Sequence, residues 1–239
     1  MNESSYVETF DDGPGGWWGF VSNAAGPKPL EYRHGMVISR SPWWIDYNHA
    51  PPGAGYLHMV FCLFTAGPIP EYYMEVAGPN RFVASGCSRN FVNAKITVRI
   101  KGELVSRGAG LVLLIQSKVG KVITPWALTS QPINITQDWS EQTIVCTPDE
   151  SQWTCLGARY DRQDYYGHGD LREALSDVNC DILLILFPVT VAPMGEIDGD
   201  MNVLRPDKDY PVWRSHTPEG YVILDTFSIK FVENIENQN

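Results

Sequence analysis

Apolar and polar residues alternate regularly in the segment 91–101 of this chain. Its apolar set is Val92, Ala94, Ile96, Val98 and Ile100. Its polar set is Asn93, Lys95, Thr97, Arg99 and Lys101. A period of two places the two sets on opposite faces of a β-strand, so the segment predicts a strand with one face in a core and one in water.

Six further segments are rich in β-branched and aromatic residues and are predicted to be strands. They are 34–40, 56–64, 110–118, 141–147, 181–190 and 221–231. Segments 56–64 and 182–187 are apolar on both parities, which is typical of central strands covered on both faces. One helix is predicted at 170–178, because Asp170 and Glu173 have the spacing of a capping arrangement and the apolar residues that follow share one face.

The predicted strands extend over the whole length, and 17 prolines and 21 glycines separate them. No Ser/Gly linker, repeat or low-complexity tract divides the chain. We therefore predict one all-β domain over residues 1–239, a two-layer antiparallel β-sandwich (jelly roll) with long loops and one short helix. The long loops are expected at 42–55, 67–89, 153–169 and 193–220.

Composition narrows the set of partners. Hydrophobic residues make up 44% of the 239 residues, enough for a core, and the formal net charge is −10 without any cluster of Lys and Arg. Nucleic acid and a membrane are therefore not expected partners, whereas a homo-oligomer stays open. Residues 1–5 show no secretory signal and the five cysteines form no C-x-x-C motif, so we expect a cytoplasmic protein with reduced cysteines.

The two ends of the chain carry a pattern that resembles a known architecture. The sequence reads VETFDDG at 7–13, GWWG at 16–19, INITQDW at 133–139 and YVILDTFSI at 221–229. This pattern resembles the jelly-roll carbohydrate-binding modules, which are galactose-binding-domain-like sandwiches. The resemblance covers about a third of the chain, and it implies a saccharide or glycoside as the ligand.

The same resemblance implies a structural Ca²⁺ between the first and last strands. Asp225 shares its parity with the apolar residues Phe227 and Ile229, and a buried carboxylate must be paired, hydrogen-bonded or bound to a metal. Glu8 and Asp11 lie in the N-terminal segment that would run alongside, and they would complete an oxygen cage. The alternative is that Asp225 caps neighbouring amides at a strand end. No organic cofactor is predicted, because neither a Walker loop nor a Rossmann glycine pattern is present.

The segment 39–53 is the densest group of chemistry-bearing side chains. Sugars present C–H faces to aromatic rings and hydroxyls to planar polar groups, so a saccharide site needs both kinds of residue. The predicted ligand-binding residues here are Arg40, Trp43, Trp44 and Asn48, and the predicted catalytic residues are Asp46, Tyr47 and His49. The alternative is that the two tryptophans cover one end of the sandwich.

Two further loops offer candidates. In the loop that precedes the helix, Tyr165 or His168 is a candidate acid or base, and Asp161 is a candidate catalytic carboxylate. Arg159 or Arg162 would neutralise a substrate carboxylate. An Arg–Asp network that only orders this loop is the competing interpretation. In the loop at 193–220, Trp213 and His216 are candidate ligand-binding residues, although a loop that only covers the sandwich would use them equally well.

Three functions remain open at this point. The first is a carbohydrate-binding protein that uses these loops. The second is a carbohydrate-active enzyme: a lyase with a Tyr/His pair, or a hydrolase with two carboxylates such as Asp46 and Asp161. The third is a structural or assembly protein, because Trp, Tyr and Arg are also common in protein–protein interfaces. Convergence of the polar loop residues on one cleft would favour catalysis, and an aromatic-floored groove would favour binding.

Overall fold

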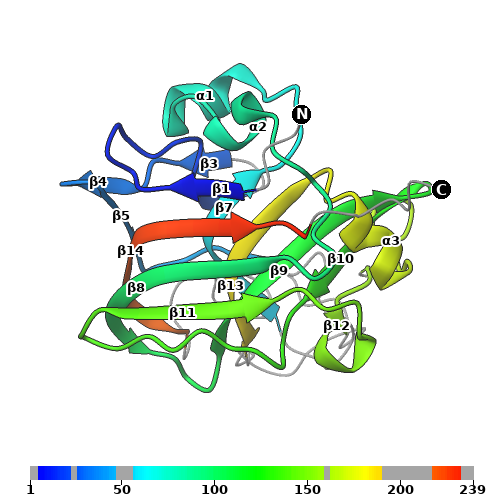
Figure 1. The fold of residues 1–239 in the computed structure, drawn as a ribbon. Coiled ribbons are helices and arrows are strands. Elements are labelled where there is room, and N and C mark those ends of the chain that lie inside the picture. Colours follow the sequence, from blue (N-terminus) through cyan, green and yellow to red (C-terminus); the bar gives the residue numbers. More distant parts are fainter. Residues whose placement is uncertain (1–4, 23–25, 47–55, 159–161, 190–216, 233–239) are drawn as a thin grey trace.

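Two antiparallel sheets face one another across an apolar core in this computed structural model (Figure 1). The structure describes residues 5–22, 26–46, 56–158, 162–189 and 217–232. Within these residues each of the two large sheets has six strands. The prediction of an all-β, two-layer antiparallel sandwich is confirmed.

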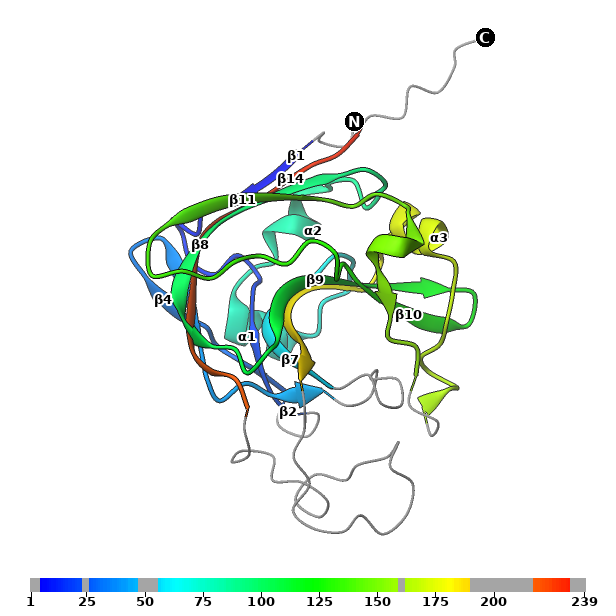
Figure 2. The ribbon, with the colours of Figure 1, turned by 90° about the horizontal axis from the view of Figure 1, so that it is seen from below.

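Sheet A has the strand order β11-β8-β14-β5-β4, and β1 also pairs with β14. Its strands are β1 (Ser5–Glu8), β4 (Glu31–Arg33), β5 (Met36–Arg40), β8 (Lys95–Val105), β11 (Ser140–Val145) and β14 (Glu219–Lys230). Figure 2 shows β11, β8, β14 and β1 side by side along one wall of the sandwich.

Sheet B has the strand order β12-β10-β9-β13-β7-β6. Its strands are β6 (Ile45–Asp46), β7 (Tyr56–Phe64), β9 (Gly110–Val119), β10 (Val122–Ala127), β12 (Thr154–Cys155) and β13 (Asp181–Val189). A separate two-stranded ribbon pairs β2 (Gly19–Ser22) with β3 (Gly26–Lys28).

Sheet B is covered on both faces, as the apolar runs of its central strands predict. In β13, Ile182 and Leu184 point into the core between the sheets, whereas Leu183 and Ile185 belong to a second apolar cluster on the outer face of sheet B. This outer cluster also contains Trp18, next to β2, and residues of the helix α1. The outer face of sheet B is therefore a second buried layer and not a solvent-facing sheet.

The strand with the clearest alternation begins later than its sequence pattern suggests. Ile96, Val98 and Ile100 are buried as predicted, but β8 starts at Lys95 and not at position 91. Asn93 adopts a positive φ of 60°, and the Ala94 amide donates to the Phe91 carbonyl. A tight turn therefore occupies the first residues of the predicted strand.

The segment 67–89, expected to be an irregular loop, contains two short helices. These are α1 (Glu71–Ala77) and α2 (Arg81–Ser85), which lie together next to β1 and β3 (Figure 1). The side chain of Asn80 accepts a hydrogen bond from the Val83 amide and so caps α2. The sequence did not predict these helices, because each is too short to show a clear helical period and because Gly and Pro residues surround them.

The helix predicted at 170–178 is confirmed as α3 (Leu171–Ser176). The Asp170 carboxylate accepts a hydrogen bond of 2.8 Å from the Glu173 amide, as its spacing predicts. A single turn of 3₁₀ helix, η1, spans Glu150–Gln152. None of the helices in the described ranges is both long and apolar enough to cross a membrane.

Candidate functional site

The apolar layer on the outer face of sheet B opens into a cavity of about 460 Å³, which we call the aromatic pocket. Its aromatic lining consists of Trp18, Phe20, Phe64, Tyr72, Tyr73, Tyr165 and Tyr166. Its polar lining includes Gln116, Asn179 and Asp181. A cavity of this size, with one aromatic wall and several polar groups, has the character of a small-ligand site.

Trp18 holds the aromatic lining in place. Its side chain is buried, and its amide and carbonyl form a bridge with Cys62 of β7, with N–O distances of 3.0 and 2.9 Å. The Trp18 ring lies 5.4 Å from that of Phe64 and 4.8 Å from that of Tyr73, measured between centroids. Contacts of this kind fix ring orientation, so the pocket wall is preorganised.

Tyr72 and Tyr165 supply the accessible rings of the pocket. They are 54% and 55% exposed, although both line the cavity. Tyr72 packs at 4.6 Å against Tyr73 at the start of α1, and Tyr165 packs at 4.6 Å against Tyr166. Each exposed ring is therefore supported by a neighbouring ring and can be covered by a ligand.

Strand β10 positions Tyr165 and Tyr166. The Ile123 amide donates to the Tyr165 carbonyl at 2.9 Å, and the Gly167 amide donates to the Ile123 carbonyl at 3.0 Å. This parallel bridge places residues 165–167 beside β10 of sheet B. Tyr165 is the one predicted catalytic residue that lines the aromatic pocket among the described residues.

The polar groups of the pocket can form hydrogen bonds but are poor nucleophiles. Burial raises the pKa of Tyr73, so its hydroxyl stays protonated and can donate. Burial, together with the nearby Asp181, raises the pKa of Cys180 to about 11, so this thiol is not a nucleophile at neutral pH. Asp181 is the carboxylate of the described lining.

Trp43 and Trp44, predicted as ring platforms for a sugar, are both buried. Trp43 is 1% exposed in the core between the sheets, where its Nε1 donates to the Ser39 hydroxyl at 2.9 Å. Trp44 is 5% exposed in the outer cluster, with its ring 6.2 Å from that of Phe20. This burial corrects the prediction of open platforms, because neither ring presents a free face to a ligand.

Arg40 and His168 also lie away from the aromatic pocket. Arg40, at the end of β5 in sheet A, pairs with Glu31 at 2.8 Å and lies over the Tyr221 ring at 5.0 Å. His168 is exposed, and its ring lies against Gly157. The structure therefore does not gather these predicted residues with Tyr165 into one cleft.

The other predicted residues of the three loops are not described in the structure. Asp46 lies in the short strand β6, but its side chain is outside the described set. The residues that lie wholly outside the described ranges are Tyr47, Asn48, His49, Arg159, Asp161, Trp213 and His216. Their roles stay predictions.

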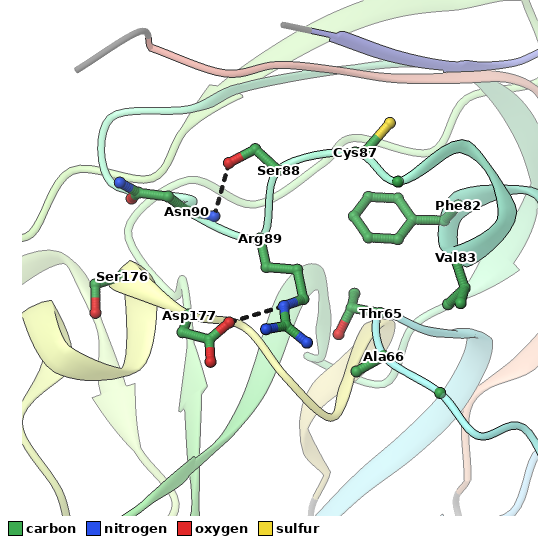
Figure 3. A pocket seen from close by; sticks show the side chains of 12 residues that line it. Thr65, Ala66, Phe82, Val83, Cys87, Ser88, Arg89, Asn90, Ser176 and Asp177 are labelled. Carbon is green, nitrogen blue, oxygen red and sulfur yellow. Dashed lines mark hydrogen bonds and ion pairs between the residues drawn. The ribbon is translucent and has the colours of Figure 1, made fainter. Parts of the chain in front are cut away.

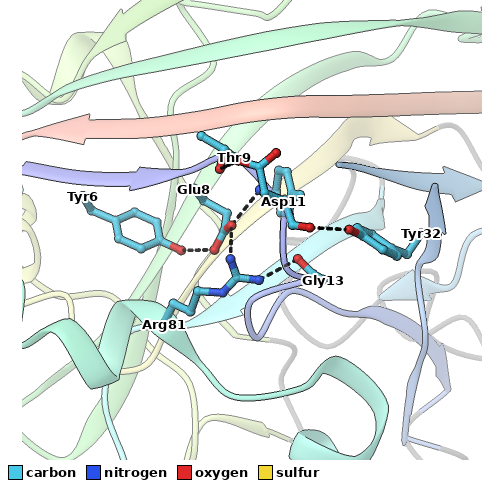
Figure 4. A network of polar contacts seen from close by, with 8 residues as sticks. Tyr6, Glu8, Thr9, Asp11, Gly13, Tyr32 and Arg81 are labelled. Carbon is cyan, nitrogen blue, oxygen red and sulfur yellow. Dashed lines mark hydrogen bonds and ion pairs between the residues drawn. The ribbon is translucent and has the colours of Figure 1, made fainter. Parts of the chain in front are cut away.

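Of the three carboxylates predicted to bind Ca²⁺, Glu8 is buried beside a cation of the protein itself (Figure 4). One Glu8 oxygen accepts hydrogen bonds from Arg81 at 3.0 Å and from the Phe10 amide at 2.8 Å. The other oxygen accepts from the Tyr6 hydroxyl at 3.2 Å. Asp11 is exposed and accepts from the Thr9 hydroxyl at 2.6 Å.

Asp225 lies on the outer face of sheet A, contrary to its expected burial. Strand β14 has a bulge between Leu224 and Thr226, where its partner changes from β5 to β1. The bulge reverses the parity of the strand, so Leu224 and Phe227 both point inward while Asp225 pairs with Arg99 at the surface. Glu8, Asp11 and Asp225 do not converge, and the described residues contain no group of three metal-ligating side chains.

Most of the aromatic pocket was not predicted from the sequence. Tyr72 and Tyr73 lie in a segment bounded by Pro70 and Gly78, and they form an adjacent aromatic pair like Trp43 and Trp44. The same criterion that selected the tryptophan pair would have selected this tyrosine pair. The contribution of Asp181 had no comparable signal, because it begins a strand that the sequence shows as apolar.

Comparison with known proteins gives structural likeness only. No protein-family model and no curated protein matches the chain. The L4b domain of human laminin alpha-2 is similar over 96% of this chain and 98% of its own, with 11% identity and a TM-score of 0.39. A second similar structure has the description "Prominent members of the human gut microbiota express endo-acting O-glycanases to initiate mucin breakdown". It is similar over 95% of this chain and 99% of its own, with 10% identity and a TM-score of 0.39. We derive no function from likeness at this level.

Proposed function

We propose that this β-sandwich protein binds a saccharide or glycoside in the aromatic pocket. The observation that carries the proposal is the pair of accessible rings, Tyr72 and Tyr165, in a cavity whose other wall is made of packed aromatic residues. Sugar rings have apolar C–H faces that stack on aromatic rings, and their hydroxyls require acceptors and donors at the edge of the stack. Asp181 and the Tyr73 hydroxyl supply such groups.

Binding is favoured over hydrolysis by the groups that line the pocket. A glycosidase places two carboxyl groups across the scissile bond, about 5–10 Å apart. The described lining contributes Asp181 as a carboxylate, together with ring faces and amides. These groups recognise and orient a sugar, and we therefore propose recognition as the function of this pocket.

The test combines a panel of neutral and acidic oligosaccharides with thermal-shift and calorimetric titration. Ligands of the wild-type chain should raise its melting temperature. Tyr72→Ala and Tyr165→Ala should each weaken binding roughly 5- to 30-fold, equivalent to about 1–2 kcal/mol for a lost stacking ring. Tyr72→Phe should retain most of the affinity, because the ring face remains.

Tyr32→Ala is the matched control. Tyr32 is 41% exposed, like the pocket tyrosines, but it lies in sheet A and its hydroxyl donates to the Asp11 carbonyl. Equal affinity loss in the control and in Tyr72→Ala would contradict a site in the aromatic pocket. Absence of any response to the panel would contradict saccharide binding. Mass spectrometry of the same mixtures distinguishes intact sugars from products of hydrolysis or elimination.

A further inference from the structure

Figure 3 shows a second cavity, of about 500 Å³, which we call the arginine pocket. It lies next to the aromatic pocket. Ala66 and Gly67 line both cavities. The segment 177–181 also passes from one to the other: Asp177 lines the arginine pocket and Asp181 the aromatic pocket. A ligand of more than one sugar ring in the aromatic pocket can therefore extend towards the second cavity.

Arg89 is held in the arginine pocket by one edge only. Its Nε lies 2.8 Å from one oxygen of Asp177, whose other oxygen accepts a hydrogen bond of 3.1 Å from Asn179. Among the described residues neither terminal nitrogen of Arg89 has a protein partner, and Figure 3 shows the guanidinium between Asp177 and Thr65. The fork of the two terminal nitrogens is therefore oriented and available to a ligand.

The backbone around Arg89 is also fixed. The Arg89 carbonyl accepts a hydrogen bond of 2.9 Å from the Val178 amide, and the Phe91 amide donates to the Leu175 carbonyl at 2.7 Å. Both bonds tie this segment to the end of α3. The Arg89 side chain is 43% exposed and is therefore accessible to a ligand, and its fixed backbone reduces the entropy that binding costs.

Thr65 supplies an independent sign of a ligand. Its side chain is 2% exposed, it lines the arginine pocket, and its hydroxyl has no hydrogen-bond partner among the described residues. A buried hydroxyl without a partner costs free energy, and a ligand oxygen in the pocket would remove that cost. Figure 3 shows this hydroxyl on the side of the pocket that faces Arg89.

We propose that the arginine pocket binds the carboxylate of an acidic saccharide whose neighbouring sugar ring occupies the aromatic pocket. The planar fork of Arg89 matches the two oxygens of a carboxylate, and the Thr65 hydroxyl donates to a remaining lone pair. This inference rests on the proposed function and specifies its ligand class. A uronate and a sialate share the required carboxylate, so both belong to the class.

The test uses matched pairs of tri- to pentasaccharides that end in glucuronate, galacturonate or N-acetylneuraminate. The partner of each is its carboxyl-reduced form, in which a CH₂OH group replaces the carboxylate. The wild-type chain should bind at least one acidic form roughly 10- to 100-fold more tightly than its reduced partner, because a charge-assisted pair is lost on reduction. The pairs that show the preference distinguish uronates from sialates.

Three variants locate the preference. Arg89→Gln should abolish the difference between acidic and reduced forms while it retains the affinity for the reduced form. Asp177→Asn should strengthen acidic binding about fivefold, because it keeps an acceptor for Arg89 Nε and removes a negative charge. Arg172→Gln, on the exposed face of α3 and outside both pockets, should change neither affinity.

The outcomes separate this inference from the proposed function. Equal affinity of the wild-type chain for acidic and reduced forms would overturn the arginine pocket as a carboxylate site and leave saccharide binding intact. A preference that survives Arg89→Gln would overturn it as well. If neither form binds, both proposals fall.

Discussion

The guanidinium of Arg81 and the buried carboxylate of Glu8 form an ion pair of 3.0 Å that joins the start of α2 to β1 (Figure 4). Glu8 is 1% exposed, and burial raises its pKa even though Arg81 and the Phe10 amide favour the charged form. The second terminal nitrogen of Arg81 donates to the Gly13 carbonyl at 2.8 Å. One arginine therefore neutralises the core carboxylate and fixes the turn that follows β1.

Arg81→Gln should destabilise the protein by about 3 kcal/mol or more at pH 8, because it leaves a buried charge without its cation. The loss should be smaller at pH 5. Without Arg81 the pKa of Glu8 rises further. When an acid has a higher pKa in the folded state than in the unfolded state, the free energy of unfolding of the protein decreases as the pH increases. Urea unfolding at the two pH values measures this difference.

Arg33→Gln is the control for this experiment. Arg33 also pairs with a glutamate, Glu31, but its side chain is 67% exposed. A solvent-exposed pair contributes little, so the control should unfold almost as the wild type does at both pH values. A similar loss in the two arginine variants, or a loss that does not depend on pH, would contradict the assigned role of Glu8.

His58 should make the protein less stable in acid. Its side chain is 1% exposed, its Nδ1 lies 2.8 Å from the Trp43 carbonyl, and burial lowers its pKa from 6.5 to about 4. Between these values the unfolded chain binds a proton that the folded chain does not. The free energy of unfolding therefore falls by up to about 3 kcal/mol as the pH decreases from 6.5 to 4.

Replacing His58 removes this contribution to the pH dependence. His58→Gln should flatten the stability profile between pH 4 and 6.5, whatever its effect on stability at pH 7. Chemical unfolding at several pH values gives both profiles, and identical slopes for the wild type and His58→Gln would show that another group titrates.

Asp225→Ala should have a small effect, although the sequence pattern suggests a buried residue. The Asp225 and Arg99 side chains are 25% and 42% exposed. We expect a change within about 1 kcal/mol, or a decrease of less than about 4 °C in melting temperature. Glu8→Ala, scanned in parallel, should reduce the melting temperature by more. A larger shift for Asp225→Ala than for Glu8→Ala would reverse this assignment.

Local sequence determined the elements whose physical cause is local. The spacing of Asp170 and Glu173 predicts the cap of α3, because the hydrogen bond joins residues only three positions apart. The apolar parities of 56–64 and 182–187 predict strands covered on both faces, because every side chain of such a strand must leave water. The sequence by itself thus determined the all-β sandwich.

Tertiary pairing decided the features that depend on strand partners. Asp225 points outward because β14 exchanges β5 for β1 at that position, and the resulting bulge reverses the pattern of the strand. Trp43 and Trp44 are neighbours in the sequence, yet they lie in different apolar clusters on the two sides of sheet B. Neither outcome follows from local periodicity, because both depend on which strands pair and where.

The aromatic pocket likewise exists only in the folded chain. Tyr72 comes from a short helix before β8, and Tyr165 comes from a segment that β10 holds by backbone hydrogen bonds. The two residues are far apart in sequence and line one cavity because sheet B brings their segments to the same face. The sequence determined that aromatic residues were available, and the packing of α1 and the 165–167 segment against sheet B decided which of them form a site.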